Sequence, residues 1–260
     1  MPESPPDQPS AEKPATTPAQ LPSSPGQLHS ALKDLLHQGD LYRRAQPKAA
    51  ARGDWWDPLS GRVPQSQLPP EFVMDPARAR EAAVLVLFCT QEHRPHTPAP
   101  YVLLTERAAG LAKHPGQISF PGGASEDFDP DPSATALREA QEEIGLDPVR
   151  VEIAGTLPPA PVPVSGYMVT PVLAVTSDPG VLTPQSGEVA RVLRAPVAHL
   201  RDPQRRRTSM MQRGGMTFRG PSFLHDDVLV WGFTGILLDR IIARLGWEQP
   251  WDTSQEVSPF

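Results

Sequence analysis

Three glutamates, Glu139, Glu142 and Glu143, lie close together in the segment 138–145. In a helix, positions three and four residues apart share one surface, so the three carboxylates would form a single acidic face. Like charges about 4 Å apart repel by about 4 kcal/mol at an effective dielectric near 20, before screening, and a divalent cation reverses that repulsion. Carboxylates are ligands that Mg²⁺ combines with substrate phosphates. The spacing therefore fits either a Mg²⁺ or Mn²⁺ site or a solvated face in which Arg138 pairs with Glu142.

The helix that would carry these glutamates has predicted ends. Asp131 followed by Pro132 favours a helix start, because aspartate accepts hydrogen bonds from free N–H groups and proline presets φ. Gly145 favours a left-handed end. The apolar stripe that would pack on a sheet consists of Leu137, Ala140 and Ile144.

A glycine-rich turn, Phe120-Pro121-Gly122-Gly123, stands before this helix and can follow a strand. Paired glycines allow backbone geometries and close approaches that a Cβ atom would prevent. A strand, a glycine turn and an acidic helix in this order move the interpretation of the acidic face toward a metal site.

The combined pattern resembles the box of the Nudix hydrolases, whose strand, loop and helix bind metal and cleave pyrophosphate linkages. The matching positions are Gly123, Arg138, Glu139, Glu142, Glu143, Gly145 and Leu146. The resemblance implies that Glu139, Glu142 and Glu143 hold Mg²⁺ or Mn²⁺. It also implies that Arg138 orients a glutamate through a charge-assisted hydrogen bond. The general box has thirteen residues between its glycine and its arginine; here there are fourteen, and the expected first glutamate falls near Asp129.

Other segments resemble the coenzyme A pyrophosphatase branch of that family. They are Leu103-Leu104-Thr105, Arg107, Ala108, Gly116, Phe120 to Gly123, and the runs 165–172 and 230–238. The substrate-binding candidates are Arg107, Lys113, His114, Gly122, Gly123 and Tyr167. Tyr167 would stack on a base, line the pocket or lie at the edge of the core. Glu188 falls where this branch has a further carboxylate, so either Glu139 or Glu188 is the general base.

The resemblance has one gap that bears on the substrate. Ala112 stands where the coenzyme A signature has an arginine, and the neighbouring Lys113 grips phosphate differently. Three functions stay open. The first is hydrolysis of coenzyme A or its derivatives to 4′-phosphopantetheine and adenosine 3′,5′-bisphosphate. The second is hydrolysis of another nucleoside diphosphate derivative, such as NADH, ADP-ribose or a nucleoside polyphosphate. The third is a Nudix-fold module that binds a nucleotide without cutting it.

Composition limits the class of protein. Of 260 residues 34 are proline, and eight of these fall in the first 26 residues, which predicts a disordered tail. The net charge of −6 argues against a general nucleic-acid-binding surface. Cys89, the only cysteine, is typical of a reducing compartment and lies in the apolar run 82–89, too short for a bilayer span of about 20 residues. We therefore expect a cytoplasmic protein with a small nucleotide substrate and neither nucleic-acid nor membrane partners.

The elements that must position the site alternate between strands and helices. Strands are predicted at 82–90, 101–105, 149–157, 169–175 and 228–231, with a break at 158–166 and a helix at 232–245. The first two strands would form a hairpin with a long loop. Such a pattern predicts a mixed sheet between helices, and the resemblance makes that a Nudix-like α/β/α sandwich.

The expected domain plan has four parts: a disordered tail at 1–26, an accessory segment at 27–79, the hydrolase domain at 80–246 and a C-terminal tail at 247–260. An amphipathic helix is predicted from Gln27 to Gln38, with Gly39 as its stop. That helix would pack on the hydrolase domain or on a second subunit, which leaves a homodimer open. The arginine-rich stretch 201–219 predicts a solvated hairpin or a surface that attracts polyphosphate.

Overall fold

The computed structural model describes residues 20–46, 74, 78–90, 100–111, 115–213 and 215–259. Most of the predicted tail at 1–26 and most of the segment 47–79 lie outside these residues. The same is true of Ala112, Lys113 and His114. The first part of the chain forms α1 (Pro25–Ala45), β1 (Arg80–Cys89), β2 (Tyr101–Arg107), β3 (Ile118–Ser119), β4 (Gly122–Ala124), α3 (Pro132–Ile144), η4 (Pro148–Arg150), β5 (Glu152–Thr156), β6 (Ala160–Val162), β7 (Tyr167–Thr176) and β8 (Val189–Pro196). The remainder forms α4 (Val197–Leu200), η5 (Pro203–Arg205), β9 (Arg206–Arg213), β10 (Met216–His225), β11 (Val228–Val230), α5 (Gly232–Arg244) and β12 (Glu256–Val257).

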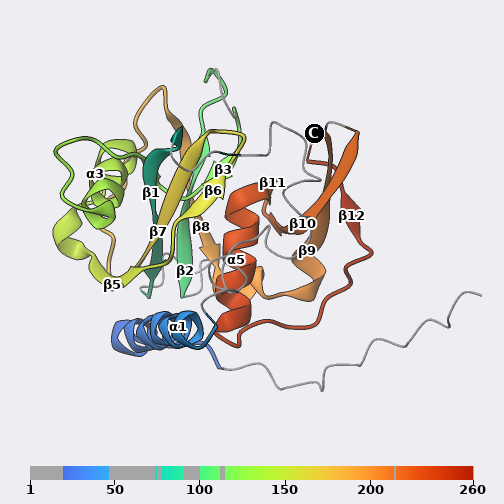
Figure 1. Ribbon diagram of the computed structural model, residues 1–260, viewed down its shortest axis with the longest axis horizontal. Helices are drawn as coiled ribbons and strands as arrows, with labels where there is room; N and C mark the ends of the chain where they lie inside the picture. The colour runs from blue at the N-terminus through green and yellow to red at the C-terminus, as the bar shows by residue number, and fades with distance from the viewer. Residues whose placement is uncertain are drawn as a thin grey trace, which may run out of the picture.

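Strand β1 lies at the centre of the first sheet (Figure 1). It runs parallel to β7 along its whole length and antiparallel to β2 and β4. The predicted hairpin of the first two strands is confirmed, since Phe88 pairs with Val102. The sheet is therefore mixed, as predicted. Within the described residues it has the path β3-β2-β1-β7-β5, with β4, β6 and β8 paired beside it.

Helices cover both faces of this sheet, which confirms the α/β/α sandwich (Figure 1). Successive side chains of a strand point to opposite faces, so β1 contributes to two cores. Leu85 and Leu87 pack in the core that α3 covers, whereas Val86 and Phe88 pack in the core that α1 and α5 cover. The buried Cys89 belongs to the α3 side, in agreement with its predicted place in a strand.

Helix α1 packs on the strands of this chain rather than requiring a second subunit. Its buried leucines are Leu28, Leu32 and Leu35. Gly39 was the predicted stop, and this is wrong, because the helix continues to Ala45 with Gly39 buried in its interior. Tyr42, in the extra turns, packs against the core, and tertiary packing of this kind outweighs the low helix propensity of one glycine.

Two strand boundaries differ from the prediction. Residues 149–150 belong to η4 and β5 starts at Glu152, because Asp147 caps the turn through the Val149 N–H and Pro148 occupies its first position. The predicted break at 158–166 contains β6, which pairs antiparallel with the beginning of β7. Its central Pro161 is compatible with an edge strand, where no ladder donor is needed on the open side.

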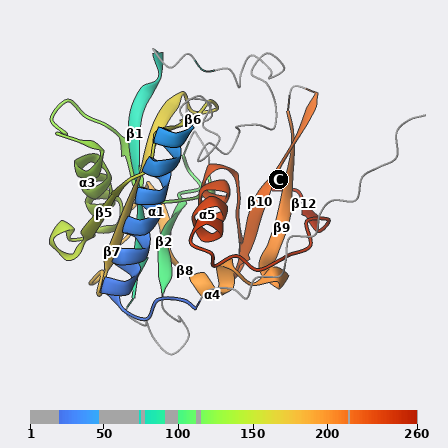
Figure 2. The same ribbon diagram turned by 60° about the horizontal axis from the view of Figure 1, so that its bottom comes forward.

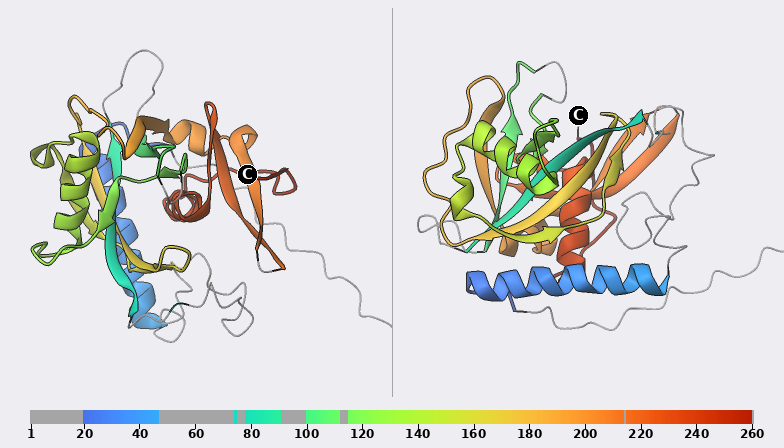
Figure 3. Two further views of the ribbon diagram at one scale, coloured as in Figure 1. Left: turned by 90° about the horizontal axis from the view of Figure 1, so that it is seen from above. Right: turned by 60° about the vertical axis from the view of Figure 1, so that its left-hand side comes forward.

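A second sheet has the strand order β11-β10-β9-β12, and α5 lies between it and the first sheet (Figures 2 and 3). Strands β9 and β10 form the expected arginine-rich hairpin. The prediction that it is solvated fails at Arg206, which is 1% exposed. The Arg206 guanidinium lies over the rings of Phe223 and Trp251, and it pairs with Asp239 of α5. Residues 247–260 differ from the expected tail, since β12 runs parallel to β9 and Trp247 is buried against Phe88.

Candidate active site

Helix α3 begins and ends as the sequence predicts. The Asp131 side chain accepts a hydrogen bond from the Ala134 N–H at 2.9 Å, and Gly145 has the left-handed φ of 67°. Ala140 and Ile144 are fully buried, which fixes the helix on the sheet and turns its glutamates toward the glycine turn. The ends and the apolar stripe together determine where the carboxylates lie.

The glycine turn passes very close to its neighbours. Gly122 and Gly123 belong to β4 and pair with Val84 and Ala83 of β1. A Cβ atom on Gly122 would lie 2.3 Å from the carbonyl oxygen of Ala83, and its φ of 151° favours glycine. A Cβ atom on Gly123 would lie 2.4 Å from Oε2 of Glu139. Both glycines are thus required by close approach, one to the backbone and the other to a candidate metal ligand.

Glu143 is the most buried of the three glutamates, at 6% exposed. Its Oε2 accepts a hydrogen bond from the Gly122 N–H at 3.1 Å. The pKa of Glu143 is raised to about 7, mainly by burial and also by the charges of Glu139 and Glu188. The Gly122 N–H and the charge of Arg107 oppose the shift. The carboxylates therefore repel one another in a partly desolvated place.

Glu139 and Glu142 differ in burial. The Glu139 side chain is 19% exposed, and burial raises its pKa; Arg138 opposes this, and the charges of Glu142 and Glu188 add to it. The Glu142 side chain is 58% exposed. Both carboxylates accept hydrogen bonds from Nη1 of Arg138, at 2.9 Å and 3.1 Å. Arg138 therefore contacts two of the three glutamates, and its role in orienting them stays a prediction.

Asp129 holds Arg138 from the other side. Arg138 donates from Nε to Oδ1 at 3.1 Å and from Nη2 to Oδ2 at 2.9 Å, and it also donates to the Ala124 carbonyl at 2.9 Å. The hydrogen bonds from Arg138 keep the pKa of Asp129 well below its usual range. Asp129 was absent from the predicted site residues. The available signal was its place near the expected first glutamate of the box.

Arg107 and Glu188 lie near enough to the carboxylates for their charges to affect Glu143. The charges of both act on Glu143, and the Ala108 N–H donates to the Glu188 carbonyl at 2.8 Å, which joins their segments. Nε of Arg107 is buried and has no hydrogen-bond partner. A buried, unpaired guanidinium nitrogen beside carboxylates is suited to an anionic ligand.

Tyr167 lies at the start of β7, where the guanidinium of Arg80 covers its ring at 4.2 Å from the centroid. This contact occupies one face of the ring. Lys113 and His114 lie outside the described residues.

The chemistry of the donors fits a divalent cation. The candidates supply only carboxylate oxygens, and the raised pKa values of Glu139 and Glu143 reflect burial and like charges that a cation would offset. Within the described residues, no three histidine, cysteine, aspartate or glutamate side chains converge in a preformed metal cluster. Two of the three proposed ligands are paired with Arg138 instead.

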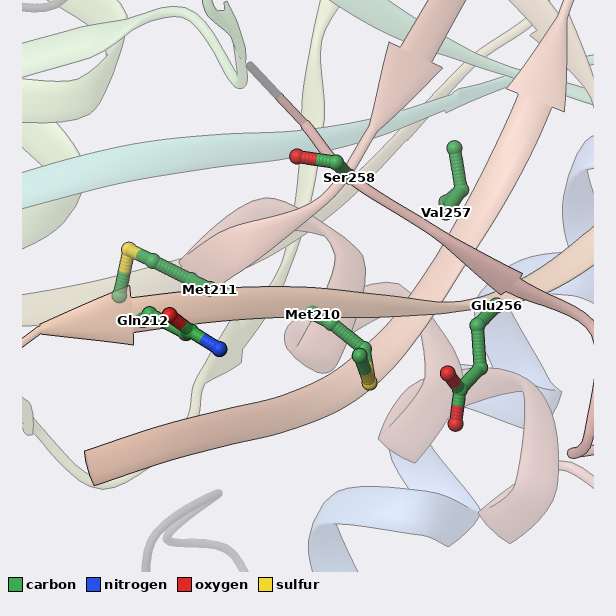
Figure 4. Close-up of a pocket in the computed structure, with 6 residues that line it drawn as sticks. All are labelled: Met210, Met211, Gln212, Glu256, Val257 and Ser258. Atoms are coloured by element: carbon green, nitrogen blue, oxygen red, sulfur yellow. The ribbon is translucent and has the colours of Figure 1, made fainter. Parts of the chain in front are cut away.

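A pocket of about 390 Å³ lies elsewhere, between β9 and β12 (Figure 4). Its lining consists of Met210, Met211, Gln212, Glu256, Val257 and Ser258. None of the candidate site residues lines it, so the pocket does not belong to the carboxylate site.

Comparisons with known proteins match the part of the chain that carries the candidate site. The family model described as "NUDIX domain" matches residues 79–212. An uncharacterized Nudix hydrolase NudL from Shigella flexneri is 35% identical over 179 residues, which cover 69% of this chain and 90% of that protein. NudL from Escherichia coli K12 is 34% identical over the same length and with the same coverage.

Solved structures include a Nudix hydrolase from M. smegmatis, RenU, at 25% identity and a TM-score of 0.39, covering 46% of this chain and 73% of that one. The Nudix domain of Shewanella oneidensis NrtR, crystallised with ADP-ribose, is 21% identical with a TM-score of 0.36 and covers 51% of this chain and 80% of that one.

No helix in the described part of the chain is both long and apolar enough to cross a membrane.

Proposed function

Because the chain belongs to the Nudix hydrolase family, we propose that it hydrolyses the pyrophosphate bond of coenzyme A or its derivatives. The products would be 4′-phosphopantetheine and adenosine 3′,5′-bisphosphate. The observation that carries the proposal concerns Arg107, which matches a position of the coenzyme A signature: its Nε is buried and unpaired, and its charge acts on Glu143. That nitrogen can donate to a phosphate oxygen while the carboxylates hold the cation.

In the proposed site, Glu139, Glu142 and Glu143 would hold Mg²⁺ or Mn²⁺, which would supply positive charge to the pyrophosphate and would lower the pKa of a bound water molecule. Arg138 keeps Glu139 and Glu142 in place through its hydrogen bonds, and Asp129 in turn keeps Arg138 in place. Either Glu139 or Glu188 accepts the proton of the attacking water. Positioning and charge stabilisation of this kind supply most of the catalysis in phosphoryl transfer.

A second candidate is hydrolysis of another nucleoside diphosphate derivative, such as NADH, ADP-ribose or a nucleoside polyphosphate. The replacement of the signature arginine by Ala112 favours it, because alanine offers no charge to the 3′-phosphate or the pyrophosphate. Binding without hydrolysis has less support, since all three box glutamates are present. A homodimer and a cytoplasmic location complete the proposal.

The test is hydrolysis of coenzyme A, acetyl-coenzyme A, NADH, ADP-ribose and dGTP with Mg²⁺ or Mn²⁺, with the products separated by chromatography. We expect adenosine 3′,5′-bisphosphate to be released from coenzyme A with the highest kcat/KM of the panel. A higher value for another substrate would establish the second candidate. Turnover of none of the five, by protein that binds Mn²⁺, would contradict both and leave a nucleotide-binding module.

A further inference from the structure

The loop between β4 and α3 places an aromatic ring in solvent. Phe128 is 72% exposed, and it is the aromatic member of the exposed large hydrophobic residues in the described part of the chain. The others are Leu41, Val149, Val164 and Val181. A ring this exposed leaves a large apolar surface available for contact with a ligand.

This loop is fixed by hydrogen bonds on both sides of Phe128. The Asp129 N–H donates to the Glu126 carbonyl at 2.9 Å, and the Glu126 N–H donates to Oδ2 of Asp129 at 3.0 Å. The Thr135 hydroxyl donates to the same carboxylate at 2.9 Å. With Arg138 also bound to Asp129, the backbone that carries Phe128 is held to α3. The ring is therefore presented by an ordered turn.

The ring lies next to the carboxylate site. The guanidinium carbon of Arg138 is 5.6 Å from the centroid of Phe128, and the same guanidinium donates to Glu139 and Glu142. One arginine thus separates the exposed ring from two of the proposed metal ligands. A molecule whose pyrophosphate lies at those ligands has its remaining groups within reach of Phe128.

Other aromatic rings near the site are less available. Tyr167 is only partly exposed, and Arg80 lies 4.2 Å from the centroid of its ring, closer than the 5.6 Å between Arg138 and Phe128. Phe120 is only 2% exposed. Stacking on a planar aromatic side chain is a common way to hold a nucleobase and needs an accessible ring on a fixed backbone. Phe128 meets both requirements.

We propose that Phe128 is the platform on which the base of a nucleotide substrate stacks while its pyrophosphate lies at Glu139 and Glu142. The inference rests on the proposed function and deepens it, since it names a base-bearing substrate and a residue that selects it. A substrate with the same phosphates and no base lacks this contact.

The test compares the binding of ADP with that of inorganic pyrophosphate, both in the presence of Mn²⁺, by titration calorimetry. In Phe128→Ala we expect the Kd for ADP to rise roughly 5- to 100-fold, the range for loss of one stacked base, and the Kd for pyrophosphate to stay within about twofold. Phe128→Trp should keep tight ADP binding. Val149→Ala, which removes a side chain that is 92% exposed elsewhere, is the matched control and should change neither Kd.

Equal Kd values for ADP in the wild type and Phe128→Ala would overturn the inference, as would a wild type that binds pyrophosphate but not ADP. If both Kd values rose equally in Phe128→Ala, the role of Phe128 would be only to hold Arg138 in place, and the inference would be overturned. Since these readouts are binding constants, they stand apart from turnover. A wild type that binds ADP through Phe128 but hydrolyses no substrate would contradict the proposed function and leave this inference intact.

Discussion

Gly123 and Glu139 fit against each other so closely that a Cβ atom on the glycine would lie 2.4 Å from Oε2 of the glutamate. The conflict involves only the end of a flexible side chain, because the three nearest atoms all belong to the Glu139 carboxylate. A substitution here therefore moves a candidate metal ligand and leaves the backbone in place.

Gly123→Ala should fold normally and lose activity. We expect its free energy of unfolding to stay within about 1 kcal/mol of wild type. Its kcat/KM should fall roughly 100-fold, the usual effect of misplacing a reacting or metal-binding group by about 1 Å. Gly26→Ala, at a position with open space around it, is the control and should keep full activity in the hydrolysis assay. Full activity in Gly123→Ala would contradict the role of Glu139.

Glu142→Gln should abolish turnover and leave the fold intact. The Glu142 side chain is 58% exposed, so replacing its carboxylate by an amide should disturb the packing little. Loss of one cation ligand should lower kcat by roughly 100-fold or more. Circular dichroism checks the fold, and Mn²⁺ titration followed by electron paramagnetic resonance checks the cation. Substantial remaining activity would remove Glu142 from the metal site.

Glu143→Gln should stabilise the protein while inactivating it. Because the pKa of Glu143 is raised to about 7 in the folded state, ionisation opposes folding, and this destabilisation is absent at pH 4 and fully present above pH 7. A shift of that size corresponds to about 3 kcal/mol. Urea unfolding with EDTA at pH 8 should show a higher free energy of unfolding for Glu143→Gln, with the difference shrinking toward pH 5. The exposed Glu142→Gln serves as the control and should shift stability by less than about 0.5 kcal/mol.

Asp129→Asn should lower kcat, although Asp129 acts on the site through Arg138 and does not contact the substrate. The neutral amide keeps one acceptor oxygen, so at most one of the two hydrogen bonds from Arg138 remains and the carboxylate charge is lost. Weakening of such outer contacts typically lowers activity 10- to 100-fold. Asp129→Glu, which keeps the charge, should recover much of the activity. Asp127→Asn, at an exposed neighbouring position, should have no effect on kcat. If Asp129→Asn matched the wild type in kcat and KM, Arg138 would not depend on this contact.

His225 and His199 make the stability of the protein depend on pH. Their rings lie 6.4 Å apart at the junction of β10 with α4, and Nδ1 of each is buried without a partner. Burial lowers both pKa values, and the charge of Arg205 lowers both further while that of Asp226 opposes the shift. Arg191 also lowers the pKa of His225, and Asp202 opposes the shift of His199. The unfolded chain therefore takes up more protons below about pH 6.5, so stability falls as the pH drops from 7 to 5.

The measurement is urea unfolding of the wild type and His225→Gln from pH 5 to 8. His225→Gln should lose less stability on acidification than the wild type does. His37→Gln, at an exposed position on α1, should follow the wild-type curve. Parallel curves for all three proteins would exclude His225 as a source of the pH dependence.

Local sequence signals predicted the framework of the site. Asp131, Pro132 and Gly145 define the ends of α3 because a cap, a preset φ and a left-handed glycine act within a few residues. Gly122 and Gly123 predicted a close approach between the turn and its neighbours, because glycine has no Cβ atom. The sequence did not reveal which atoms approach them, because Ala83 and Glu139 come from other elements.

What the sequence missed depends on contacts between distant segments. Helix α1, which contains the buried Gly39, packs on strands β5 and β7. Arg206 is covered by rings that come from β10 and from the C-terminal segment. From the sequence alone, a stretch with six arginines is expected to be solvated, because its partners Trp251 and Asp239 lie in other segments of the chain. Phe128 likewise had no signal in the sequence, since its meaning lies in its distance from Arg138.

The position of α1 beneath β5 and β7 also has a consequence for synthesis of the chain. Leu28, Leu32 and Leu35 leave the ribosome early, yet the residues that bury them, such as Ala154, Leu157 and Leu173, are translated much later. Until then the three leucines stay accessible to water and to chaperones. The apolar face of α1 can therefore dock only after β5 and β7 have been translated, so this helix gains its tertiary stabilisation long after its own synthesis.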